Sequence, residues 1–256
     1  MMNIAWFKRD LRVADNAALS SAINCGSVLP LYIYEPELWQ QPDMSRRHYD
    51  FLKECLISLR ADLKSLGLTL VTKTGDTLEI LQSIHERHNV KSIWSHQETW
   101  NRWTYQRDIR VKQWALTNNI QWNEPAQNGV IRNIRTRNGW SANWYKEMRK
   151  PASIINTITE VVDEGSDTTP SPKQLRLSGD SCKSRQPGGR LEAQTLLKTF
   201  LYERGEEYSK EMSSPVTAFD SCSRLSPHLA FGTISVREAF SATEKRIHEL
   251  KNTSPE

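Results

Sequence analysis

The stretch NIAWFKRDLRVADNAALSSAI, residues 3–23, predicts a strand, a charged loop and a helix in direct succession. Asn3–Phe7 is apolar enough for a buried strand, and Asp15 or Asn16 can cap the helix that runs to Ile23. A strand that leads directly into a helix is the first half of a βαβ unit. We therefore expect these residues to open an α/β domain.

The rest of the first half repeats this alternation. Apolar strands are predicted at 28–34, 68–72, 90–95 and 120–122, with a long helix between Ser45 and Gly67 and further helices at 77–88 and 103–119. Short strands separated by helices require right-handed crossovers, which predicts an α/β fold with a doubly wound parallel sheet. Ligands of such sheets bind at the carboxyl ends of the strands. The loops after Phe7, Tyr34 and Ser95 are therefore the first places to search.

The composition predicts a globular, cytoplasmic protein. Among 256 residues, 38% are hydrophobic and 25% charged, and no run of about 18 apolar residues predicts a membrane span. The amino terminus lacks the apolar segment of a secretory signal. Four cysteines without a CxxC pair predict neither a disulfide framework nor a metal site, and His85 with His88 lacks a third ligand nearby.

The rest of the chain contains regions that differ in charge and composition. Ten basic residues against four acidic ones between Gln97 and Lys150 could attract phosphate, or could simply form a solvated face. A stretch rich in Ser, Thr, Pro and Gly from 152 to 189 predicts a surface linker between a domain at 1–151 and a helical region at 190–256. Helices are expected at 190–205, from Ser226, and at 236–250, the last with a capping box of Ser235 and Glu238.

Three strings within residues 1–151 resemble the photolyase/cryptochrome family. WFKRDLRVADNAAL (residues 6–19) is similar to the family's opening W-F-R-R-D-L-R followed by D-N-x-A-L. SHQETWNRWTYQRDIRVKQW (95–114) corresponds to the region that lines a pocket for an antenna chromophore, a folate or a deazaflavin. NGVIRNIRTRNGWSANWYKEMRKP (128–151) resembles the segment that closes the α/β domain in a bacterial branch, and by itself predicts a hairpin-like stretch on the sheet.

The fourth string, CSRLSPHLAFGTIS (222–235), resembles the family's T-S-R-L-S-P-x-L-x-x-G motif, which wraps the diphosphate of FAD. Hydroxyl groups, an arginine and the free N–H groups of a helix start suit that task. Methionine stands at position 212, where several photolyases have an arginine that meets DNA phosphate. Cysteine replaces the motif's threonine. The resemblance assigns FAD contacts to Tyr208, Cys222, Ser223, Arg224, Leu225 and Ser226.

The resemblance implies light-driven, FAD-dependent repair of pyrimidine dimers in UV-damaged DNA, the activity of a deoxyribodipyrimidine photolyase. It also implies an α-helical FAD-binding domain that continues well past residue 256, so we expect a truncated chain with weak or no repair activity alone. Two alternatives stay open: a cryptochrome-type blue-light sensor, and a stand-alone α/β module that binds a chromophore or nucleotide. The residues present identify no catalytic group and leave the oligomeric state open.

Overall fold

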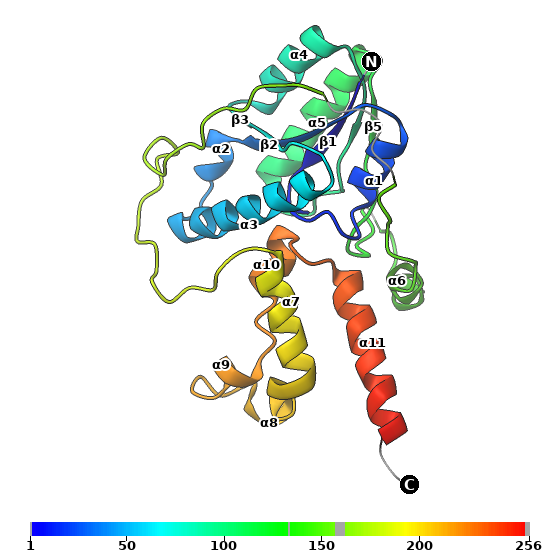
Figure 1. Cartoon of the computed structure of the whole chain (residues 1–256), viewed down its shortest axis with the longest axis vertical. Helices are drawn as coiled ribbons and strands as arrows, with labels where there is room; N and C mark the ends of the chain where they lie inside the picture. The colour runs from blue at the N-terminus through cyan, green and yellow to red at the C-terminus, as the bar shows by residue number, and fades with distance from the viewer. Residues whose placement is uncertain (1, 133, 157–161, 254–256) are drawn as a thin grey trace.

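The computed structural model describes residues 2–132, 134–156 and 162–253, and its centre is a five-stranded sheet (Figure 1). The strand order is β3-β2-β1-β4-β5 and every pairing is parallel, which confirms the doubly wound α/β prediction. The order reverses between β1 and β4, so the switch point of the sheet lies there. The strands are β1 (Met2–Phe7), β2 (Val28–Tyr34), β3 (Val71–Thr74), β4 (Val90–Trp94) and β5 (Gln121–Asn123).

Helices cover both faces of the sheet, and alternate residues of each strand supply the two cores. On one face, Ala5 and Phe7 pack with residues of α1 (Ala17–Asn24) and α3 (Arg46–Ser65). On the other face, Ile4 and Trp6 pack with α4 (Thr77–His88) and α5 (Arg102–Thr117). The short α2 (Pro36–Trp39) follows β2. Strands buried on both faces explain the continuous apolar runs in the sequence.

The third strand begins three residues later than its apolar run predicts, because Leu68 belongs to the end of α3. The backbone N–H of Leu68 bonds to the carbonyl of Leu63 (2.9 Å), and that of Gly67 bonds to Lys64 (3.0 Å). Gly67 has a φ of 77°. These bonds form a Schellman motif, which closes the helix and leaves Leu68 buried against it.

The hairpin-like stretch expected within 128–151 is wrong, because the segment forms a helix. After Gly139, with a φ of 72°, the chain enters α6 (Trp140–Met148). Trp144 of this helix lies edge-on to Phe240, with ring centroids 5.5 Å apart. The spacing of Trp140, Trp144 and Met148 by four residues is the helical signal within this polar segment.

Part of the stretch predicted as a surface linker bonds to the open edge of the sheet, and its described residues form no regular helix or strand. The N–H of Asp167 bonds to the carbonyl of Thr72 (2.7 Å), and the Asp167 carboxylate accepts from the N–H of Thr74 (2.8 Å). We call residues 162–175 the edge strap, because they satisfy polar groups of the edge strand β3. Residues 157–161 of the predicted linker lie outside the described residues.

A carboxylate anchors the edge strap to the sheet domain. Glu164 contacts Lys73 of β3 (2.6 Å), Arg87 (3.0 Å) and His88 (2.8 Å) of α4. Burial alone would raise the pKa of Glu164, but the hydrogen bonds from Lys73 and His88 lower it to about 2. Farther along the strap, Leu175 is buried in the core beneath α3.

The remaining helices project from one end of the sheet domain (Figure 1). The helix expected over 190–205 is α-helical only as far as Thr199, where it continues as a π-helix. Ser235 and Glu238 form the predicted capping box, with N–H to side-chain oxygen distances of 2.9 Å in both directions. The elements are α7 (Arg190–Thr199), η1 (Phe200–Arg204), α8 (Tyr208–Glu211), α9 (Ala218–Ser221), α10 (Ser226–Phe231) and α11 (Val236–Thr253).

Candidate functional site

The two most distinctive strings of the sequence meet in the structure, at a place we call the joint. The N–H of Leu11, in the loop after β1, bonds to the carbonyl of Phe231 (3.1 Å). The guanidinium of Arg12, which is buried, donates to the carbonyl of Gly232 (3.0 Å). Gly232 has a φ of 69°, and a Cβ there would collide with the Arg9 carbonyl. Only glycine allows this close approach of the two backbones.

Asp15 extends the joint to the start of α11. Its carboxylate accepts hydrogen bonds from the Ser235 hydroxyl (2.6 Å), Arg237 Nε (3.1 Å) and the N–H of Ser153 (3.1 Å). Asp15 is almost fully buried and has a φ of 47°. The prediction that Asp15 or Asn16 caps α1 is resolved in favour of Asn16, whose side chain accepts from the N–H of Leu19 (2.9 Å). Asp15 does not cap α1, and its carboxylate instead binds residues of the second half of the chain.

Beyond the joint, the loop of predicted site residues is held by its backbone carbonyls. Arg204 donates to the carbonyls of Cys222 and Ser223, and Gln186 donates to that of Arg224 (2.7 Å). Arg224 has a φ of 59°, a strained conformation for a residue with a side chain. Cys222, Ser223 and Arg224 are only half-buried. The backbone of the loop is therefore held through its carbonyls, while the side chains of Cys222, Ser223 and Arg224 remain partly accessible.

The other predicted site residues fall into three environments. Leu225 is buried in a small core with Leu197 and Ile234, whereas Ser226 is exposed at the first position of α10. Tyr208 lies at the start of α8 with its ring edge-on to Phe200, at a centroid distance of 5.6 Å. The π-helix η1 therefore connects Tyr208, through Phe200, with the loop that Arg204 holds.

Arg204 is the residue that the sequence did not single out. Besides the two loop carbonyls, it donates to the carbonyl of Leu196 (2.9 Å) and to the hydroxyl of Thr199 (3.1 Å). Burial and the nearby charge of Arg224 lower the pKa of Arg204. Widened π-helical turns occur frequently at functional sites. Its partners lie up to 19 residues away, so no local pattern identifies it.

The carboxyl ends of β1, β2 and β4 hold a buried charge cluster. Arg107 contacts Glu35 (2.6 Å), Asp108 (2.8 Å) and also Glu98, and Lys8 contacts Asp108 (3.3 Å). Burial alone would lower the pKa of Arg107, but the three carboxylates raise it far above its usual value. Burial is the main cause of the raised pKa of Glu35, which Arg107 only partly offsets.

This cluster fills most of the place where the sequence predicts a pocket for a planar ring. The Arg9 guanidinium lies 3.2 Å from the centroid of the Trp100 ring and covers the cluster. Beside it, Asp10 and His96 form a buried pair at 2.6 Å. Neighbouring cavities beside Trp100 and Trp103 are about 150 and 220 Å³, and the cavity bounded by Arg9, Trp100 and Arg107 is about 30 Å³. That volume accommodates about one water molecule.

His228 of α10 packs against the sheet domain. It is fully buried, with Nδ1 3.0 Å from the Thr233 hydroxyl and its ring edge-on to Phe51 of α3. Its Nε2 is buried and has no hydrogen-bond partner in the part of the chain that the structure describes. Burial lowers the pKa of His228 to about 4.

We expect the free energy of unfolding to fall by on the order of 2 kcal/mol as the pH drops from 6.5 to 4. The unfolded chain binds the proton at the ordinary histidine pKa, whereas the folded chain binds it only near pH 4. Urea denaturation at several pH values measures this slope. His228→Leu removes the titrating group and should flatten the curve by this amount, and equal slopes in both proteins would contradict the assignment.

The histidines and cysteines form no metal centre among the residues that the structure places. No group of three or more His, Cys, Asp or Glu side chains there is arranged to hold a metal ion. His88 contacts Glu164, and His85 lies edge-on to Trp114. All four cysteines are unpaired. Across the same described residues, no helix has both the length and the apolar character needed to cross a membrane.

The chain is similar to photolyases and cryptochromes. The family model described as DNA photolyase matches residues 3–161. Cryptochrome-2 of Arabidopsis thaliana is 29% identical over 274 residues, with 93% of this chain and 42% of that protein covered. The deoxyribodipyrimidine photo-lyase of Buchnera aphidicola is 28% identical over 272 residues, covering 99% and 54%. The chain thus spans about half the length of these curated relatives.

Solved structures share the fold. A photolyase from Sulfolobus tokodaii, whose crystal structure contains two FAD molecules, has a TM-score of 0.72 at 22% identity, covering 98% of this chain and 57% of that chain. A cryptochrome from Synechocystis has a TM-score of 0.75 at 18% identity, covering 100% and 57%. The similarity extends through the helices after residue 189 as well as the sheet domain.

Proposed function

The chain belongs to the DNA photolyase family, and on that premise we propose that it takes part in light-driven, FAD-dependent repair of pyrimidine dimers in DNA. In this proposal residues 1–151 form the α/β domain, 152–189 connect it to the second domain, and 190–256 open the FAD-binding domain. UV-damaged DNA is the proposed partner, and the cytoplasm the proposed location.

The observation that carries the proposal is the fixed loop after α9. Its backbone carbonyls are occupied by Arg204 and Gln186, so the loop can present its side chains to an anion without first becoming ordered. The donors suit a diphosphate: two hydroxyls, a guanidinium and the free N–H groups at the start of α10. The proposed FAD contacts are Tyr208, Cys222, Ser223, Arg224, Leu225 and Ser226.

Each group has a different part in holding FAD. Ser223 and Ser226 would donate hydroxyl hydrogen bonds to the diphosphate, and Arg224 would neutralise one of its charges. Cys222 contributes a thiol, a weaker donor than a hydroxyl. Arg204 is a positioning residue, because its contacts are to the loop carbonyls. When bound, FAD would supply the light-excited electron, while protein groups orient and shield it.

The test is FAD uptake by the full chain, measured by visible absorption after gel filtration. We expect the wild type to retain a flavin band, and Arg204→Met to weaken FAD binding about tenfold or more by releasing the loop carbonyls. Arg204→Lys should restore part of the affinity. Arg135→Met, which alters an exposed arginine, is the control and should bind FAD normally.

Repair is the second readout of the same experiment. The FAD-loaded chain should cleave dimers in a UV-irradiated oligonucleotide weakly at most, and only under light. A wild type that takes up no FAD, or an Arg204→Met variant with unchanged affinity and spectrum, would overturn the flavin site. Cleavage that proceeds equally in the dark would overturn the repair proposal and leave the flavin site intact.

Met212 favours the second candidate function, a blue-light sensor. It lies at the end of α8 with 47% of its surface exposed, where an arginine would meet DNA phosphate in several photolyases. A flavin signal that changes under light without dimer cleavage would support the sensor. An antenna chromophore, a folate or a deazaflavin, belongs to the same proposal, and it would require side chains around Arg9 and Trp100 to move because the two cavities beside them are only about 30 and 150 Å³.

A further inference from the structure

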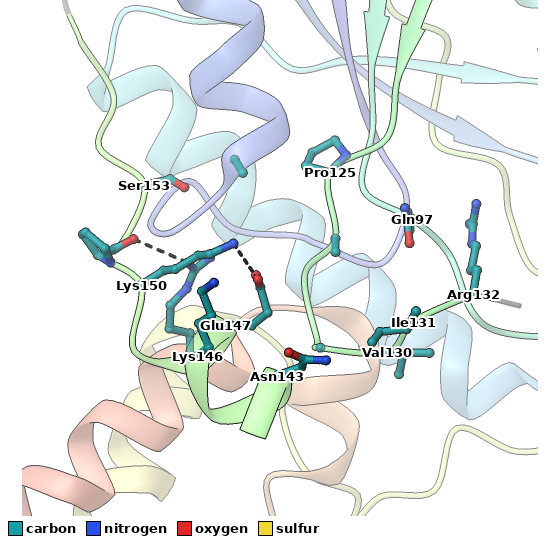
Figure 2. Close-up of a pocket in the computed structure, with 15 residues that line it drawn as sticks. Gln97, Pro125, Val130, Ile131, Arg132, Asn143, Lys146, Glu147, Lys150 and Ser153 are labelled. Carbon is teal, nitrogen blue, oxygen red and sulfur yellow. Dashed lines mark hydrogen bonds and ion pairs between the residues drawn. The ribbon is translucent and has the colours of Figure 1, made fainter. Parts of the chain in front are cut away.

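A cavity of about 860 Å³ lies apart from the loop after α9 and borders the charge cluster through Arg132, which contacts Asp108 (3.8 Å) (Figure 2). Its walls come from the loop after β5, from α6 and the residues that follow it, and from the first turns of α1 and α11. Ala17 and Gln97, which both line it, follow β1 and β4 in the chain. The cavity therefore lies beside the switch point, where doubly wound sheets bind their ligands.

The cavity has an excess of positive charge. Its charged lining residues are Arg132, Lys146, Lys150, Arg237 and a single carboxylate, Glu147. Neighbouring carboxylates outside the cavity pair with two of the cations: Arg132 contacts Glu124 (3.0 Å) and Arg237 contacts Asp15 (3.1 Å). Lys150 pairs with Glu147 (2.6 Å), as Figure 2 shows. A negatively charged ligand would complement the positive charge that these ion pairs leave unbalanced.

Lys146 is the cation of the cavity that has no carboxylate partner among the described residues. Lys146 is exposed and makes no polar contact with the residues that the structure describes. The amide side chains of Gln97 and Asn143 also line the cavity, and neither has a hydrogen-bond partner within the described ranges. One ammonium group and two amides are thus available to a ligand without breaking a contact.

One wall of the cavity is apolar. Val130 and Ile131 lie next to each other with 42% and 43% of their surfaces exposed, and Figure 2 shows them close to Asn143. Pro125 and Ala126 continue this wall. Two adjacent aliphatic side chains half-exposed inside a cavity gain free energy when an apolar group covers them. The ligand should therefore combine an anionic group with an apolar body.

We propose that this cavity binds a phosphorylated organic anion of nucleotide size. Its phosphate lies at Lys146 and Lys150, and its ring system lies against Val130 and Ile131. The volume falls in the range of about 300–1,000 Å³ typical of small-molecule sites. Glu147 opposes the phosphate, because it holds Lys150 and repels the negative charge. The proposal is independent of FAD binding at the loop after α9.

The test uses isothermal titration of the full chain with AMP, adenosine and inorganic phosphate. AMP should bind at least about tenfold more tightly than either fragment, since only AMP engages both the ammonium group and the apolar wall. Lys146→Ala should weaken AMP binding about tenfold, and Glu147→Gln should strengthen it. Lys112→Ala, which removes an exposed lysine of α5, is the matched control and should leave the affinity unchanged.

Three results would overturn the proposal. They are absence of AMP binding at millimolar concentration, unchanged affinity in Lys146→Ala, and Lys146-dependent binding of a single-stranded oligonucleotide that AMP does not compete for. The last result would identify a nucleic-acid surface instead. FAD uptake measured on Lys146→Ala should equal that of the wild type, which separates this site from the proposed flavin site.

Discussion

Replacing Gly232 with alanine is expected to lower the free energy of unfolding by about 3 kcal/mol or more, in the range of overpacked and strained positions. The new Cβ would collide with the Arg9 carbonyl and lie 2.5 Å from the Asp10 Cα, and neither atom belongs to a flexible side chain. The backbone must therefore shift, which also weakens the bonds from Leu11 and Arg12. Urea denaturation followed by circular dichroism measures the loss.

Gly139→Ala is the matched control for this substitution. Gly139 has nearly the same φ, 72° against 69° for Gly232, yet nothing lies within 4 Å of the position where its Cβ would be. Gly139→Ala should lower the free energy of unfolding by only about 1 kcal/mol, because alanine is strained in the left-handed conformation. Equal losses at the two positions would show that backbone conformation alone, and not the joint, requires glycine at 232.

The second large effect is expected at the buried charge cluster, where Arg107→Met lowers the free energy of unfolding by about 4 kcal/mol at neutral pH. The substitution leaves Glu35, Glu98 and Asp108 buried, with Lys8 and the more exposed Arg132 as the remaining cations in contact with the cluster. The exposed Arg102 of the same helix supplies the control, Arg102→Met, which should change stability by less than about 0.5 kcal/mol.

The pH dependence of Arg107→Met distinguishes charge from packing. Without the arginine, the pKa of Glu35 rises further above its usual value, because burial is no longer offset. The folded variant then binds protons that the unfolded chain releases, so its stability falls as the pH rises. The deficit relative to wild type should shrink from pH 8 to pH 5. A constant deficit would mean that lost packing alone explains the change.

The sequence predicts most of the sheet domain, because apolar periodicity directly reflects burial on two faces. It misplaces β3 because Leu68 is apolar for a different reason, the closing of α3. It misses α6, where glycine, asparagine and arginine residues conceal three apolar positions spaced by four. The edge strap cannot be predicted from composition, since its hydrogen bonds to Thr72 and Thr74 depend on which strand lies at the edge.

The candidate site, like the fold, could be predicted from the sequence only in part. Cys222–Ser226 are contiguous, so a short motif is enough to find them. Arg204 acts through carbonyls 18 and 19 residues away and only because η1 is a π-helix, which no local pattern encodes. The cavity at Lys146 joins residues of five different segments, so the local excess of basic residues indicates its charge but not its shape.

The edge strap also covers part of the sheet edge at which a second molecule could pair. An edge strand with unpaired N–H and C=O groups is a template for a second molecule, and aggregation often begins there. By bonding to Thr72 and Thr74, the strap occupies groups that a foreign strand would need. Glu164 holds it in place with three basic contacts, so a segment with the composition of a linker covers groups of β3 through which a second copy could otherwise pair.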